Sequence, residues 1–122
     1  MKLEEFEQEV NSVIESLPEK YTAILKREEI DIICRERVPR AVREEYRGKI
    51  VFGIFVGVPK NKKRTFSIQL QPTRIEIYKE SFEKMYGTAM TEEIKKHIFK
   101  TVVHEIAHYF GFDEKQVRER GY

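Results

Sequence analysis

The chain has 122 residues and a net charge of only +2, because 23 basic side chains are balanced by 21 acidic ones. This balance argues against a general nucleic-acid coat protein, which needs a large basic excess. Hydrophobic residues make up 40% of the chain, which is enough for one core, so we expect a single domain over residues 1–122. The lone cysteine, Cys34, excludes an intramolecular disulfide framework. No apolar run approaches the ~20 residues that span a membrane, and we expect a cytoplasmic protein with no membrane partner.

The first third of the chain is predicted to be mainly helical. Apolar residues recur at helical spacing over Leu3–Leu17, and Pro18 makes continuation unfavourable. A second, short helix is expected over residues 21–26. The β-branched run Ile30–Cys34 predicts a short strand. The highly charged stretch 35–48 is expected to be a solvated loop or a fraying helix.

The middle of the chain is predicted to form strands. Ile50–Val58 is the most apolar stretch and indicates a buried strand, in which Gly53 and Gly57 indicate a bulge or a close backbone approach. After a basic turn, apolar and polar residues alternate over 66–70 and again over 74–78. Each of these two runs predicts a strand with one buried face.

The last third is predicted to be helical again. A short helix over 81–86 precedes a longer one that Thr91 caps and that runs to about Phe110, ending at Gly111. Asp113 is expected to cap a final helix. The order of elements predicts an α+β domain with an N-terminal helix, a small twisted mixed β-sheet of three or four strands, and a long buried helix packed on that sheet.

The long helix contains the motif His104-Glu105-Ile106-Ala107-His108, which is H-E-x-x-H. Histidines four residues apart lie one turn apart on the same helix face, so their imidazoles can bind one ion. Zn2+ suits imidazole ligands, and in this motif the glutamate takes a proton from a zinc-activated water. Chance predicts only about 0.01 such motifs in a chain of this composition. The other interpretation is a pair of core histidines bonded to backbone or carboxylate groups.

Two histidines do not complete a catalytic zinc site, which needs a third protein ligand. His97 lies about 10 Å from His104 along the helix axis, so it cannot reach the same ion from an unbroken helix. We expect His97 to be an exposed or supporting histidine. Downstream, the available carboxylates are Asp113, Glu114 and Glu119.

The sequence from His104 to Glu114 resembles the extended zincin pattern of metzincin type, H-E-x-x-H-x-x-G-x-x-H/D. More particularly, the chain is similar to the minimal bacterial zincin-like metallopeptidase family over its C-terminal two-thirds. The supporting segments are 53–59, 75–78 and 101–111. The resemblance implies the layout of a minimal zincin, with the H-E-x-x-H segment as the buried active-site helix of the α+β domain.

The resemblance also implies a ligand set. Gly111 takes the position of the turn that returns the chain to the metal, and Glu114 falls on the third-ligand position, with Asp113 as the alternative. The family usually has aspartate at this position, whereas glutamate reaches one methylene further. Metzincins also carry a methionine turn after the motif, and no methionine follows Met90 here.

These features predict a zinc-dependent metallopeptidase in which Glu105 is the general base and a peptide or protein is the substrate. The peptide is expected to lie extended along a sheet edge. A non-catalytic zinc-binding or interaction module on the same scaffold is the alternative. The missing methionine turn favours the module, whereas Glu105 favours the enzyme, because metal binding alone does not need that residue.

Overall fold

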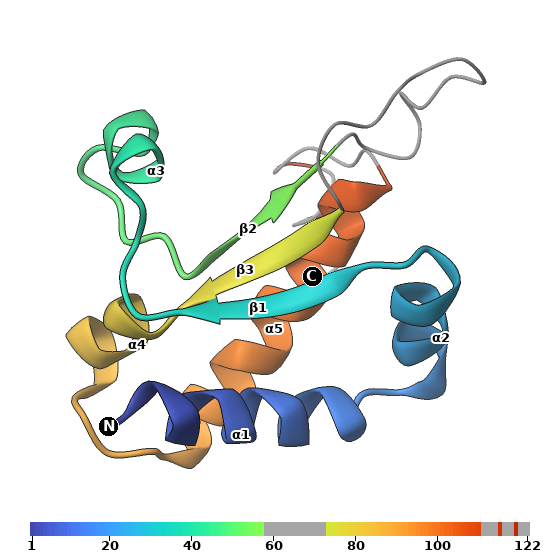
Figure 1. The fold of residues 1–122 in the computed structure, drawn as a ribbon, viewed down its shortest axis with the longest axis horizontal. Coiled ribbons are helices and arrows are strands. Elements are labelled where there is room, and N and C mark those ends of the chain that lie inside the picture. Colours follow the sequence, from blue (N-terminus) through green and yellow to red (C-terminus); the bar gives the residue numbers. More distant parts are fainter. Residues whose placement is uncertain (58–72, 111–114, 116–118, 120–122) are drawn as a thin grey trace.

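The computed structural model describes residues 1–57, 73–110, 115 and 119 (Figure 1). These residues form helices and strands in an α+β arrangement, which confirms the predicted fold class. In chain order the elements are α1 (Leu3–Glu15), α2 (Glu19–Arg27), β1 (Asp31–Arg35), α3 (Arg40–Glu45), β2 (Gly53–Val56), β3 (Arg74–Tyr78), α4 (Lys79–Tyr86) and α5 (Glu92–Tyr109).

The described strands form a mixed sheet in the order β1-β3-β2. The central strand β3 is parallel to β1 and antiparallel to β2, and Ile75 is the register partner of both Ile32 and Phe55. The buried strand expected over 50–58 is shorter and less buried than predicted. Regular pairing within the described residues covers only Gly53–Val56, and all four residues are only partly buried because β2 lies at an edge of the described sheet. The strand expected over 66–70 lies outside the described residues.

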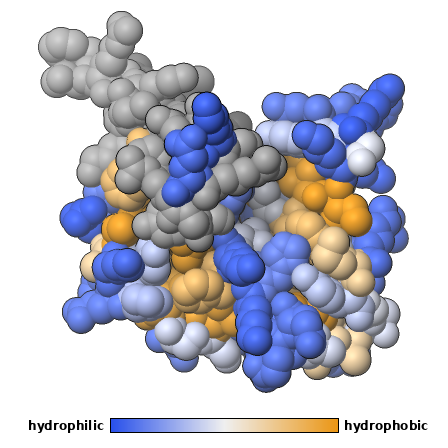
Figure 2. All heavy atoms as spheres, turned by 180° about the vertical axis from the view of Figure 1, so that it is seen from behind, coloured by the Kyte–Doolittle hydropathy of each residue, from blue (hydrophilic) through white to orange (hydrophobic). Residues whose placement is uncertain are grey.

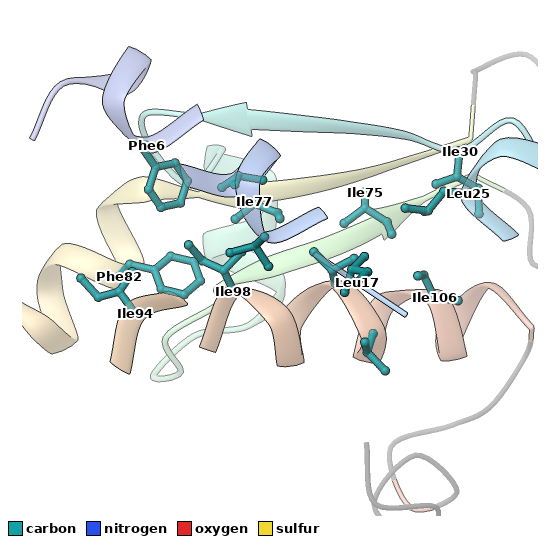
Figure 3. Close-up of a cluster of buried hydrophobic side chains, with 14 of the residues drawn as sticks. Phe6, Leu17, Leu25, Ile30, Ile75, Ile77, Phe82, Ile94, Ile98 and Ile106 are labelled. Carbon is teal, nitrogen blue, oxygen red and sulfur yellow. The ribbon is translucent and has the colours of Figure 1, made fainter. Parts of the chain in front are cut away.

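The core lies between the sheet and the two helices α1 and α5. Ile75 and Ile77 point from β3 toward Ile98 of α5, and Phe6 of α1 lies at one end of the same layer (Figure 3). The four side chains are 0% exposed. Helical spacing of apolar residues on α1 and α5 thus supplies two apolar stripes, and the inward residues of β3 fill the space between them.

The opposite face of β3 is also buried, so the prediction of one buried face for 74–78 is wrong. Tyr78 is 0% exposed and packs with Val38 and Val42 in a second, smaller cluster. Val42 belongs to α3, which occupies part of the stretch expected to be a loop or a fraying helix. The helix covers this end of the sheet because Val42 is anchored against the buried tyrosine ring.

A buried carboxylate lies on the same outer face, at Glu76, which is 3% exposed. Arg35 and Arg74 pair with its Oε2 atom at 2.9 and 2.8 Å, and the Tyr78 hydroxyl donates to Oε1 at 3.0 Å. Desolvation opposes the charge, but the three hydrogen bonds outweigh it, so the pKa of Glu76 lies below its usual value. Glu76 is therefore a charged group held by partners that β1 and β3 supply.

The helix α5 begins where it was predicted. The Thr91 side chain accepts a hydrogen bond from the backbone N–H of Ile94 at 3.3 Å, which confirms the N-cap. The helix continues to Tyr109, with Phe110 as its C-cap. Gly111 and Asp113, on which the predicted turn and the cap of a final helix depend, lie outside the described residues.

The coloured part of the surface in Figure 2 is mostly hydrophilic, with apolar side chains showing between the hydrophilic ones. In the part of the chain that the structure describes, no helix combines the length and apolarity needed to cross a membrane. Among the described residues, the large apolar side chains that are more than a third exposed are Ile33 of β1, Met85 of α4, and Tyr46 and Ile50 of the segment between α3 and β2.

Candidate metal centre

The two histidines of the motif meet on one face of the last two turns of α5. The Nε2 atoms of His104 and His108 lie 3.1 Å apart, and their ring centroids are separated by 4.7 Å. Both residues are partly buried, whereas Glu105 is only 8% exposed. The i, i+4 spacing brings the imidazoles together without any irregularity in the helix.

The geometry of this pair fits zinc. Two nitrogens about 2.0–2.1 Å from one zinc ion at a tetrahedral angle lie about 3.4 Å apart, close to the separation that the two Nε2 atoms already have. One ligand atom from each of His104, Glu105 and His108 can be chosen so that all three lie within 4.8 Å of one another. Without a metal, the same separation suits a hydrogen bond in which one neutral imidazole donates to the other.

The turn that carries His108 is fixed by the next residue. Tyr109 is 1% exposed, and its ring packs edge-on against Phe55 of β2 with centroids 5.4 Å apart. Its hydroxyl donates to Glu28 Oε1 at 3.2 Å, which joins the end of α5 to the end of α2. Tyr109 therefore serves the core and holds the helix end, rather than lining a cleft. The sequence carries no signal for this contact, because Glu28 lies 81 residues away.

His97 lies on the same helix but does not join the motif. Its ring packs against Phe52, Phe82 and Tyr86, and its Nδ1 atom is 2.8 Å from the Tyr86 hydroxyl. Burial, together with the positive charge of Lys100, lowers the pKa of His97. His97 is therefore a neutral, half-buried packing residue, in agreement with its predicted separation from the metal site.

The single cysteine, Cys34, does not take part in thiolate chemistry at neutral pH. Burial and the negative charge of Glu7 raise the pKa of Cys34 to about 12. A thiol with such a pKa remains protonated, and a protonated thiol is neither a good nucleophile nor a good metal ligand. The sequence interpretation of Cys34 as a small apolar residue agrees with this environment.

The predicted third ligand is not placed by the structure. Asp113 and Glu114 both lie outside the described residues, as does the turn residue Gly111. Glu119 is described and exposed. The metal-ligand roles of Glu114 and Asp113 therefore stay predictions from the motif.

A family model for zincin-like metallopeptidases matches residues 28–122. The chain belongs to this family. The match spans most of the chain, including β1, β2, β3 and α5, and confirms the resemblance seen in the sequence. Membership in the zincin-like family implies a metal, and the His104, Glu105 and His108 group is where the described residues can hold one. No curated protein matches the chain.

Proposed function

We propose that this zincin-like protein is a zinc-dependent peptidase in which His104, His108 and Glu114 bind the metal and Glu105 is the general base. The observation that carries the proposal is the 3.1 Å approach of the two Nε2 atoms within a helix that the family model covers. Neutral imidazoles are ordinary zinc ligands, and a carboxylate completes many catalytic sites. Asp113 is the alternative third ligand.

The chemistry divides between the metal and the chain. Zinc bound at these side chains would polarise the scissile carbonyl and lower the pKa of a water toward ~7. Glu105 accepts the proton of the attacking water and returns it to the leaving amine. Because Glu105 is nearly buried on a helix held by Tyr109 and the sheet, its carboxylate needs little reorganisation to perform both transfers.

We further propose that the substrate is a peptide or protein segment and that residues 1–122 act as one domain. Family membership supports peptide substrates. An extended peptide would bind as an additional strand beside the edge strand of the sheet and would form main-chain hydrogen bonds with it. No nucleic-acid or membrane partner is proposed.

The second candidate is a zinc-binding module without catalytic activity. The observation in its favour is the lack of any methionine after Met90, since metzincins carry a methionine turn beyond the zinc motif. The presence of Glu105 in the motif argues against it, because a purely structural zinc site has no use for a general base. The two candidates bind the same metal and differ only in turnover.

Cleavage of a mixed peptide library by the zinc-loaded protein separates the two functions. We expect metal-dependent cleavage by the wild type and at least about 100-fold slower cleavage by Glu105→Gln, because general-base catalysis contributes about 10²–10⁴-fold. Glu93→Gln is a matched control, since Glu93 is exposed in the first turn of the same helix. It should cleave like the wild type. A zinc-loaded wild type that cleaves no peptide would favour the binding module.

A further inference from the structure

A hollow lies along α5, between this helix and the helices α1 and α2. Its volume is about 700 Å³, within the range of small-molecule sites, and none of the three motif residues lines it. Val13 and Val103 form its buried apolar floor, with exposed fractions of 7% and 4%. Tyr21 and Phe99 provide partly buried aromatic walls. The hollow is therefore apolar inside and separate from the proposed metal centre.

The rim of the hollow is cationic along α5. Of the three lysines that line it, Lys95 already lies 3.7 Å from Glu9 and 3.4 Å from Glu92, the two carboxylates of the rim. Lys96 and Lys100 are exposed and lie one helical turn apart. Within the described ranges, neither has a carboxylate at ion-pair distance. Two positive charges are thus left beside the apolar floor.

We propose that this hollow binds a small amphipathic anion. An acidic head group would pair with Lys96 and Lys100, and an aliphatic or aromatic body would cover Val13, Phe99 and Val103. An anion satisfies both lysines, whereas a cation would add a third positive charge beside them. Burying the apolar body removes the floor of the hollow from water, which supplies the non-directional part of the affinity.

The hollow is independent of the proposed peptidase chemistry. Val13 and Tyr21 precede residue 28, where the family match begins, so half of its apolar lining comes from helices that the family model does not cover. The proposed binding at the hollow can therefore fail while the proposed peptide hydrolysis holds, or the reverse. Its test does not need a measurement of activity.

Calorimetric titration with decanesulfonate tests the head-group contact. We expect one binding site on the wild type and at least tenfold weaker binding to Lys96→Glu/Lys100→Glu. Lys49→Glu/Lys84→Glu makes the same change of charge at two exposed lysines outside the hollow and should bind like the wild type. Decyltrimethylammonium, which has the same tail and a positive head, should bind far more weakly to the wild type.

A filling variant tests the apolar contact. Ser12 lines the hollow from an exposed position on α1, so Ser12→Trp should abolish decanesulfonate binding. The adjacent Asn11 is exposed and outside the lining, and Asn11→Trp should retain binding. Circular dichroism checks that each variant is folded. The proposal is overturned if the wild type does not bind decanesulfonate, if the charge-reversed variant binds equally well, or if the ammonium compound binds as tightly.

Discussion

Gly53 of β2 lies so close to Thr101 of α5 that a Cβ atom on the glycine would be 2.9 Å from the threonine Cγ2 atom. The same Cβ would lie 2.7 Å from the backbone oxygen of Glu76 on the neighbouring strand. The absence of a side chain at Gly53 therefore sets the distance between the sheet and α5. Thr101 is three residues before His104, so this contact holds the helix just ahead of the motif.

Gly53→Ala is expected to lower the free energy of unfolding by about 2 kcal/mol, as overpacking of a rigid contact does. The added methyl group meets backbone on one side, which cannot move aside as a flexible side chain would. Urea denaturation of the zinc-free protein measures the change. An unaltered unfolding midpoint would show that β2 and α5 are not held together at this glycine.

Lowering the pH should destabilise the fold through His97. Burial and Lys100 lower the pKa of His97 in the folded protein, so the unfolded chain takes up a proton first, near pH 6.5. The stability that neutral His97 supports is intact above this pH and is lost as the pH falls from about 6.5 toward the folded-state pKa. Urea unfolding at pH 7.5 and 5.5 should show a smaller loss for His97→Phe than for the wild type.

The two pH values separate His97 from the buried carboxylate. The pKa of Glu76 lies below its usual value, so its contribution to stability is lost only at more acidic pH, below about 4.5. His104 and His108 are present in both proteins and cancel in the comparison. An equal loss of stability in the wild type and in His97→Phe between pH 7.5 and 5.5 would contradict the assigned environment of His97.

Local patterns were enough to predict the helices that frame the site. The apolar stripe of α1, the cap at Thr91 and the spacing of His104 and His108 are properties of neighbouring residues, and the structure confirms them. The burial of Glu76 was missed, because its charge suggests a solvated face until Arg35 of β1 is brought beside it. That contact depends on the order of the strands in the sheet. The alternation of apolar and polar residues along one strand does not predict this order.

The contact that holds the end of α5 was missed for the same reason. Tyr109 meets Glu28 only after the chain has folded, and neither residue carries a local signal for the other. The sequence does not distinguish the short helix α3 from a loop or a fraying helix, because six residues give too little periodicity to identify it. Its stability comes from Val42 packing on Tyr78, a tertiary contact.

The third metal ligand is predicted to be Glu114 rather than Asp113. Glu114→Ala should reduce zinc affinity steeply, because it removes a ligand. The free energy of unfolding should remain largely unchanged. Asp113→Ala should lower stability by about 1 kcal/mol, the usual effect of losing a helix cap, and change zinc affinity little. Zinc titration of both variants decides between them. Loss of affinity in Asp113→Ala alone would reverse the assignment, and unchanged affinity in both would exclude both residues.

The zinc content and zinc affinity of the full chain, purified without chelators, test the proposed metal centre most directly. We expect about one zinc per chain in the wild type and at least a tenfold loss of affinity in His104→Ala and in His108→Ala. His97→Phe, which replaces a histidine on the same helix outside the motif, should bind zinc like the wild type. A wild type that binds no zinc, or motif variants that bind it as tightly as His97→Phe does, would contradict the metal centre.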